Sequence, residues 1–403
     1  MRAFVFTDKA LTGQAGRFVW LEIDTEKREN ATFRRQYAVQ ALPTFFIVDP
    51  DSEKVLLRWV GGATVAQLQK MLDEGRVAMA SAPGSGKPTA ASKSRDTAAP
   101  STAAKDSSDP DVLLARADRL YGEGKNAEAA AAYRAALAAA PKDWPPAGRA
   151  TESLLFALIA TEETESCALL ARDAFPGLRH TSSAVNVAAL GLEAALSLPA
   201  EHPQRAALVA TFEAGARAVV TDRKISVADD DRSALYLMLV EARKDAKDDA
   251  GVQTLARQWA SFLEAAAKDA KTAEGRTVFD AHRLTAYLTL GEPALAIPML
   301  EASERDFPDD YNPPARLAVT YKELQRWDEA IAASQRALGK AYGPRQLRIY
   351  QNLADIQTAK GDAAGARATL QEALQLAESL PQGQRSDNTI ASLKKKIEAL
   401  PAP

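Results

Sequence analysis

The residues of this chain that could do covalent or metal chemistry are few and scattered. The 403-residue sequence has one cysteine, Cys167, in the apolar helical stretch Glu165–Leu170, and a buried thiol there acts as a small hydrophobe. Its three histidines, His180, His202 and His282, lie far apart and have no metal-ligand spacing. No Ser-His-Asp or Cys-His arrangement can be assembled. The sequence therefore predicts no catalytic residue, no metal site and no cofactor.

Two further stretches look like ligand sites, but their residues do not have the spacing that such sites require. The run Asp229–Asp231 lacks the glycine and the spaced oxygen ligands of a calcium loop, and a helix N-terminus explains it better. The stretch Pro83–Thr89 looks like a phosphate loop. However, Ser81 stands where the first glycine belongs, Pro88 follows the lysine, and no strand precedes the stretch. We therefore predict that Asp229–Asp231 lies at a helix N-terminus and that Pro83–Thr89 is part of a flexible linker.

Bulk composition narrows the classes of partner. The formal net charge is −3, from 50 basic and 53 acidic residues, so nothing drives the chain toward nucleic acid or an anionic membrane. No apolar run reaches the length of a membrane span. A single cysteine excludes an internal disulfide framework. We therefore expect no nucleic-acid partner and no membrane span, and the oligomeric state stays open.

One segment has the composition of a disordered linker. Residues 78–111 contain no Leu, Ile, Val or aromatic residue, and Ala, Ser, Pro, Lys and Thr dominate. Such a segment cannot bury enough surface to offset the entropy of ordering. We predict that it separates an N-terminal part, residues 1–77, from a helical remainder.

The helical remainder contains an internal repeat. Residues 276–380 read as three helical hairpins, in which equivalent alanines, Ala296, Ala330 and Ala366, recur after 34 and 36 residues. Small residues at these positions allow close helix contacts, which a bulky side chain would overpack. Because each hairpin leaves one apolar face uncovered, neighbouring hairpins must stack to bury it.

This period and pattern resemble those of the tetratricopeptide repeat, which implies a mostly α fold, a solenoid of αα-hairpins. Residues 112–275 are predicted to hold further such repeats, degenerate after the first. Whether this region continues the same superhelix or forms a separate bundle stays open. Residues 381–403 are predicted to be a capping helix and tail, because a terminal repeat needs a polar outer face.

The resemblance also implies a binding surface for a protein or peptide ligand on the concave face, lined by the first helix of each hairpin. The positions that match this face are Asn312, Lys322, Arg348, Gln351 and Asp355. The competing interpretation is that each is an ordinary solvated polar residue. Some relatives clamp a peptide carboxylate with Lys and Asn, but this chain has Ala315 and Val319 at those positions, so that clamp is not predicted.

The first 77 residues have a different pattern. Phe18–Asp24, Thr44–Val48 and Lys54–Val60 read as strands, Glu26–Tyr37 as a helix, and a last helix ends at Leu72. The order is therefore a strand, a helix, a β-hairpin and a helix. The alternative is an unrelated small α/β element.

The stretch from Tyr37 to Pro50 resembles the segment around the cis-proline of the thioredoxin family. The resemblance implies an α/β thioredoxin-like domain in which Leu42, Pro43 and Thr44 form the cis-proline loop. Two parts of that fold are absent from residues 1–77, namely the first strand and the Cys-x-x-Cys pair. The sequence thus predicts a thioredoxin-like domain that is redox-inactive as written.

Two functions compete. The first is a protein-interaction scaffold, cytoplasmic as written, in which the repeats are tethered to the thioredoxin-like domain. The alternative is a thiol-disulfide reductase whose Cys-x-x-Cys lies upstream of Met1, which would be periplasmic if an export signal precedes it. In a third, weaker hypothesis, the N-terminal part only assists docking.

Overall fold

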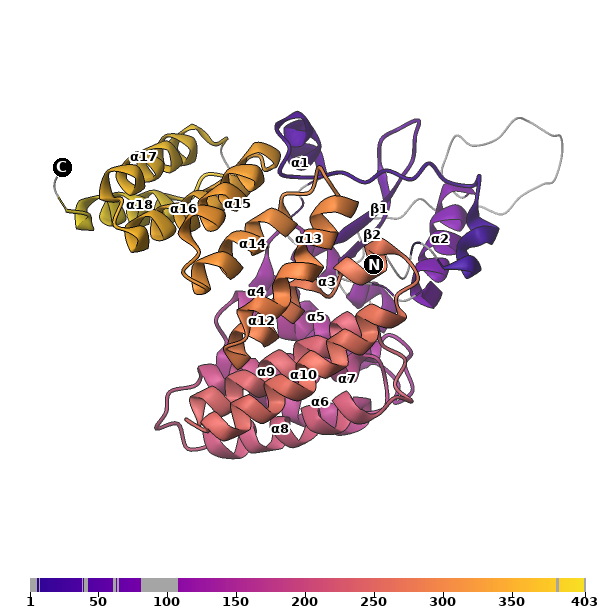
Figure 1. The fold of residues 1–403 in the computed structure, drawn as a ribbon. Helices are drawn as coiled ribbons and strands as arrows, with labels where there is room; N and C mark the ends of the chain where they lie inside the picture. The colour runs from indigo at the N-terminus through magenta and orange to yellow at the C-terminus, as the bar shows by residue number, and fades with distance from the viewer. Residues whose placement is uncertain are drawn as a thin grey trace, which may run out of the picture. The chain divides into compact units, whose positions relative to one another are not determined.

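The structure is a computed structural model, and it describes residues 6, 8–37, 39, 43–60, 63, 65–80, 108–381 and 384–401. The chain divides into two compact units (Figure 1). Unit 1 comprises Met1–Trp20 and Tyr37–Asp245, and unit 2 comprises Leu21–Gln36 and Ala246–Pro403. A short N-terminal segment therefore groups with the C-terminal helices, although its chain neighbours on both sides group with unit 1.

Unit 1 begins with a β-hairpin covered by a helix. Its elements are η1 (Lys9–Gln14), β1 (Thr44–Val48), β2 (Val55–Val60) and α2 (Val65–Ala80). The two strands pair antiparallel, and their connecting turn is stabilised by the Asp49 carboxylate, which accepts a hydrogen bond from the Asp51 N–H. The strands pack against the buried face of α2, which consists of Leu68, Met71 and Leu72. The predicted hairpin and the helix after it are confirmed.

The strand predicted at Phe18–Asp24 is wrong. The segment is extended but pairs with no strand in the described part of the chain, and Val19 is 87% exposed. At its end, Asp24 makes a local turn, because its carboxylate accepts from the Glu26 N–H at 2.9 Å. Alternating apolar residues indicate a strand only where a hydrogen-bonding neighbour exists. The helix predicted after it is present as η2 (Arg28–Asn30) and α1 (Ala31–Tyr37).

The two helices that flank the predicted linker run further into it than expected. Helix α2 continues to Ala80, and α3 begins at Pro110. Pro110 suits the first helical position because its missing N–H would be unpaired there, and the Asp109 carboxylate caps the Asp111 N–H at 2.9 Å. Residues 81–107, with the phosphate-loop look-alike, lie outside the described residues.

The rest of unit 1 consists of antiparallel helix pairs. They are α3 (Pro110–Gly122), α4 (Asn126–Ala139), α5 (Ala147–Ala160), α6 (Thr164–Leu178), α7 (Ser183–Ser197), α8 (Arg205–Thr221) and α9 (Asp229–Asp245). Consecutive helices pack on one another from α3 to α9. Alanines fill most of the close contacts, and larger side chains such as Tyr133 and Phe212 fill the space between layers.

The β-hairpin packs on the first helices of unit 1 through a stacked arginine. The Arg149 guanidinium lies 4.3 Å from the centroid of the Trp59 ring on β2. The same guanidinium donates to both oxygens of Asp118 on α3, at 3.1 and 2.6 Å, and the Tyr133 hydroxyl donates to that carboxylate at 2.8 Å. This largely buried ion pair is bidentate, and its carboxylate accepts a third hydrogen bond from Tyr133, which offsets the cost of desolvating it.

Unit 2 contains the regular repeats. Its helices are α10 (Asp249–Asp269), α11 (Ala273–Thr277), α12 (Asp280–Leu290), η3 (Pro293–Leu295), α13 (Ala296–Asp306), α14 (Asn312–Glu323), α15 (Trp327–Lys340), α16 (Arg345–Lys360), α17 (Ala363–Ser379) and α18 (Asp387–Ala399). The three equivalent alanines, Ala296, Ala330 and Ala366, have no exposed surface. They lie on the second helix of each hairpin, where it contacts the first.

Candidate functional site

The predicted binding residues lie on α14 and α16, the first helices of two consecutive hairpins in unit 2. Helix α14 also contacts α16 directly. Asn312 and Lys322 belong to α14, and Arg348, Gln351 and Asp355 belong to α16. Two of the five are engaged in contacts within the chain, and three are not.

The two engaged residues have structural partners. The Asn312 amide donates to the Asp310 carboxylate at 2.8 Å, just before α14. Asp355 accepts from the Lys396 ammonium at 3.0 Å and so links α16 to the terminal helix α18. Both contacts explain why these residues are polar without a ligand.

Lys322, Arg348 and Gln351 are the free members of the predicted set. Within the described part of the chain, no hydrogen bond or ion pair engages their side chains. Arg348 is exposed, and the other two are half-buried. These three side chains are therefore available to a ligand.

Arg316 on α14 is a further basic residue, which sequence reasoning missed. Its half-buried guanidinium makes no hydrogen bond or ion pair with any described residue. Burial lowers its pKa, and Arg348 lowers it further because the two positive charges repel, whereas Asp280 and Asp310 oppose that shift. Arg316 and Arg348 thus form a pair of like charges on neighbouring first helices, which we call the arginine pair.

A buried carboxylate, Asp280, interacts electrostatically with Arg316. Asp280 is 1% exposed and accepts a hydrogen bond from the Ser303 hydroxyl at 2.6 Å. Its other oxygen is buried without a hydrogen bond among the described residues. Burial raises the pKa of Asp280 although Arg316 attracts its ionised form. Ser303 occupies the position that Ala337 and Ala373 hold in the regular copies, so this hairpin is polar where the others are apolar.

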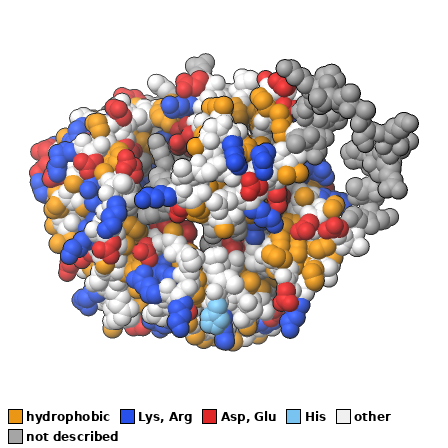
Figure 2. Space-filling view, turned by 90° about the vertical axis from the view of Figure 1, so that its right-hand side faces the viewer, with side chains coloured by type: hydrophobic (Ala, Val, Ile, Leu, Met, Phe, Trp, Pro, Cys, Tyr) orange, Lys and Arg blue, Asp and Glu red, His pale blue; other side chains and the backbone are white. Residues whose placement is uncertain are grey.

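The arginine pair is suited to binding an anion. Two guanidiniums on contacting helices that lack carboxylate partners at hydrogen-bonding distance can donate several charge-assisted bonds to a carboxylate or phosphate. Such an anion would also relieve the repulsion between the two arginines. Basic and acidic side chains are interspersed over the face seen in Figure 2.

The structure describes only part of the predicted cis-proline loop at the N-terminal hairpin. Leu42 lies outside the described residues. Pro43 is an exposed bend, and Thr44 opens β1.

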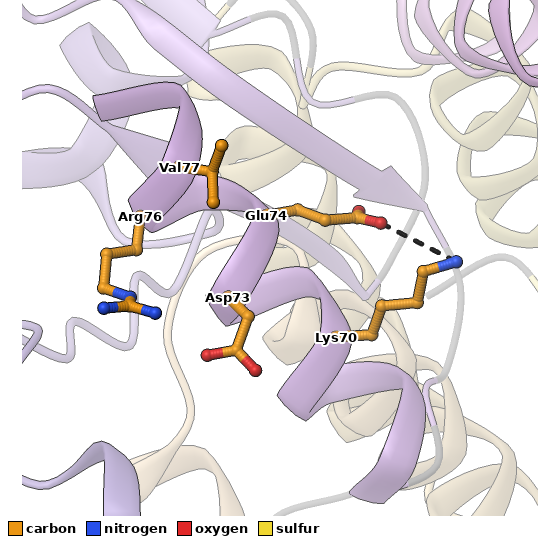
Figure 3. Close-up of a pocket in the computed structure, with 5 residues that line it drawn as sticks. All are labelled: Lys70, Asp73, Glu74, Arg76 and Val77. Carbon is orange, nitrogen blue, oxygen red and sulfur yellow. Dashed lines mark ion pairs between the residues drawn. The ribbon is translucent and has the colours of Figure 1, made fainter. Parts of the chain in front are cut away.

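A shallow hollow along α2 is a poor candidate for a site. It is lined by Lys70, Asp73, Glu74, Arg76 and Val77 and is open to solvent. Figure 3 shows these side chains projecting from successive turns of the helix without converging on one point. Lys70 and Glu74 pair with each other at 3.7 Å, which is an ordinary contact between residues four apart on a helix.

Other chemistry finds little support. Cys167 is buried in α6, and burial raises the pKa of its thiol to about 12. The described residues include no cluster of three or more acidic, histidine or cysteine side chains placed to hold a metal ion. In the same part of the chain, no helix is both long and apolar enough to cross a membrane.

Comparison with known proteins identifies the repeats. Residues 311–379 and 102–154 each match a family model described as the tetratricopeptide repeat. The chain contains tetratricopeptide repeats. The first match covers α14 to α17, which carry the arginine pair, and the second covers α3, α4 and the first half of α5. Repeats of this type generally mediate protein–protein interactions.

Three solved structures show a looser likeness, each covering 72% of this chain. A tetratricopeptide repeat protein from Parabacteroides merdae is 11% identical, with 98% of its chain covered and a TM-score of 0.44. The TPR2AB domain of yeast Sti1 in a complex with pHSP90 is 18% identical, with 98% of its chain covered and a TM-score of 0.26. The APC/C hetero-tetramer Cut9-Hcn1 is 13% identical, with 71% of that chain covered and a TM-score of 0.23. TM-scores of this size carry no argument, so the identification depends on the family matches. No curated protein matches the chain.

Proposed function

We propose that the protein is an interaction scaffold that binds an acidic segment of a partner protein on the first-helix face of its C-terminal repeats. The observation that carries the proposal is the arginine pair, Arg316 and Arg348, which lies on neighbouring helices without hydrogen-bonded or ion-paired partners among the described residues. Burial disfavours the charged guanidinium of Arg316, and Asp280 and Asp310 offset this only in part, since its pKa stays lowered. An acidic ligand would offset more of that cost.

The proposed surface also includes Lys322 on α14 and Gln351 on α16. Neither side chain makes a hydrogen bond or ion pair with a residue that the structure describes. Together with the arginine pair they favour a ligand that combines acidic side chains with backbone carbonyl groups, as a peptide does. Ala315 and Val319 occupy the positions that some relatives use to clamp a peptide carboxylate, so a different mode of recognition is expected.

The proposal for the N-terminal part is that residues 1–77 form a thioredoxin-like element that is tethered to the repeats and lacks redox activity. The β1–β2 hairpin followed by α2 supports this, whereas the unpaired segment at Phe18–Asp24 counts against it. The stack of Arg149 on Trp59 indicates a role in packing against the first repeat. No observation favours the thiol-disulfide reductase.

A selection from random peptides tests the binding proposal without requiring that the partner be identified first. The full chain would be immobilised and used to select peptides from a displayed library, in parallel with the Arg316→Glu/Arg348→Glu variant. We expect the wild-type protein to enrich peptides rich in Asp and Glu and the variant to lose that enrichment. Lys395→Glu is the matched control, because Lys395 is an exposed cation on α18. Enrichment of basic or uncharged peptides, or equal enrichment by the variant, would contradict the proposal.

A further inference from the structure

The turn between α15 and α16 carries a second basic surface within unit 2. The Arg345 guanidinium lies 4.9 Å from the ring centroid of Tyr342 and 5.7 Å from that of Tyr311. It also donates to the Tyr342 hydroxyl at 2.7 Å. Gln384, in the loop after α17, lies on the same surface, since it and Arg345 both contact Glu26. We call these four residues the Arg345 surface: Tyr311, Tyr342, Arg345 and Gln384.

The Arg345 surface is occupied by the chain's own acidic segment. Asp24 pairs with Arg345 at 3.1 Å, measured from Oδ2 to Nη2, and accepts a hydrogen bond from the Tyr342 hydroxyl. Glu26 pairs with the Nε of the same guanidinium. One arginine therefore holds two carboxylates of an Asp-x-Glu sequence.

Backbone contacts add to the charge contacts. The Gln384 amide donates to the backbone carbonyl of Glu26 at 3.0 Å. A Cβ added at Gly343 would lie 3.3 Å from that same carbonyl oxygen. The φ of Gly343 is +57°, in the left-handed region that favours glycine. The surface thus contacts the main chain of the segment as well as its carboxylates. A bound segment must therefore fit the surface with its backbone as well as with its charges.

The occupying segment is ordered by its own hydrogen bonds. The Glu26 N–H donates to the Asp24 carboxylate at 2.9 Å, and the Asn30 amide donates to the Asp24 carbonyl at 2.7 Å. Burial opposes ionisation of Asp24, but the hydrogen bonds from Tyr342 and Glu26 and the charge of Arg345 hold its pKa below its usual value. The Asp24 carboxylate is therefore ionised and held in place at neutral pH.

We propose that the Arg345 surface is a docking site for an acidic Asp-x-Glu segment of a partner protein, and that Asp24 and Glu26 are a built-in competitor for it. The contacts are exchangeable because the three charged side chains keep between 26% and 37% of their surface exposed, and such ion pairs are weak. The competitor is effective because its tether gives it a high local concentration. This inference stands apart from the proposed function, since its ligand pattern is seen in the structure.

A titration with the chain's own sequence tests this. The probe is a fluorescein-labelled peptide of residues 21–30, and the protein is the full chain with Asp24→Asn and Glu26→Gln, which removes the competitor's charges. We expect fluorescence anisotropy to show at least about ten-fold tighter binding to this variant than to the wild-type protein. Equal affinity for the two proteins, or no binding to the variant at millimolar peptide, would overturn the proposal.

Two further substitutions in the same background locate the peptide. Arg345→Ala should abolish binding, whereas Arg336→Ala should not, because Arg336 pairs with Glu304 elsewhere on the array. If Arg345→Ala binds normally and the Arg316→Glu/Arg348→Glu variant does not, the peptide occupies the arginine pair and this proposal is wrong. The reverse result supports the Arg345 surface and leaves the proposed function to its own test.

Proteolysis of otherwise wild-type protein gives a readout that does not need the doubly substituted chain to fold. Lys27 follows the docked residues directly, and its ammonium lies 5.7 Å from the Tyr342 ring centroid. In Arg345→Ala, trypsin should cut after Lys27 at least about five times faster than in the wild-type protein or in Arg336→Ala, because cleavage requires the segment to leave the surface. An unchanged rate would show that Arg345 does not hold the segment.

Discussion

At the scale of single residues, small side chains determine where the helices of the repeats can meet. Ala330 has no exposed surface, and the matched Ala296 and Ala366 have none either. A sequence can reveal such positions, because an alanine that recurs at the repeat period is best explained by a close contact. It cannot reveal which polar residues lack partners, and this is why Arg316 was missed.

The alanine contact can be tested by overpacking it. Ala330→Leu should lower the free energy of unfolding by about 1–3 kcal/mol, because three more carbons must fit between two helices. Chemical denaturation followed by circular dichroism measures the change. Ala332→Leu, at an exposed position on the same helix, is the matched control and should have little effect. Equal stability of the two variants would show that the assigned repeat register is wrong.

Cys167 allows a test of burial by its reactivity. Burial raises the pKa of this thiol to about 12, whereas an unfolded cysteine ionises near pH 8.5. At pH 8 the native thiol should therefore be neutral and inaccessible, and iodoacetamide should label the unfolded chain but not the folded one. Mass spectrometry after a short pulse measures this. Rapid labelling of the native protein would show that α6 is not packed as described.

At the scale of elements, two glycines of the C-terminal repeats differ in how strictly their positions require glycine. Gly361 ends α16 with a φ of +91°, in the left-handed region that side chains with a Cβ disfavour. Gly339 lies within α15, and a Cβ added there would meet no atom within 4 Å. One glycine is needed for its conformation and the other is not.

These two glycines form a matched pair for mutagenesis. Gly361→Ala should destabilise the protein by about 1 kcal/mol or more, because alanine is strained at that φ. Gly339→Ala should stabilise it by up to about 1 kcal/mol, because alanine is the better helix former. Thermal unfolding of the two variants measures both changes. Destabilisation by Gly339→Ala, or no destabilisation by Gly361→Ala, would contradict the description of helix α15 or of the end of α16, respectively.

The N-terminal elements show the limit of sequence patterns at this scale. The hairpin at Thr44–Val48 and Val55–Val60 was predictable, because a turn with good chemistry joins two apolar runs. Phe18–Asp24 has an equally good strand pattern and forms no strand. The two strands of the hairpin pair with each other, whereas Phe18–Asp24 pairs with no strand among the described residues. Such pairing depends on tertiary structure and not on the segment itself.

At the scale of the whole molecule, the repeats could be recognised from their period, but the grouping of the chain could not. Leu21–Gln36 belongs with the C-terminal unit, because Asp24 and Glu26 contact residues more than 300 positions away in the chain. No local sequence pattern predicts such contacts. The binding face stays a prediction. Of its five residues, Asn312 and Asp355 bind within the chain, whereas Lys322, Arg348 and Gln351 make no hydrogen bond or ion pair with the described residues.

The central claim is that the arginine pair binds an acidic segment. The most direct measurement is isothermal titration of an acidic peptide selected on the wild-type protein into that protein and into Arg316→Glu/Arg348→Glu, with Lys395→Glu as control. We predict at least about ten-fold weaker binding to the charge-reversed variant, because an anion would face two negative charges in place of two positive ones. The control should bind like the wild-type protein. Equal affinity for the wild-type protein and the charge-reversed variant would contradict the claim.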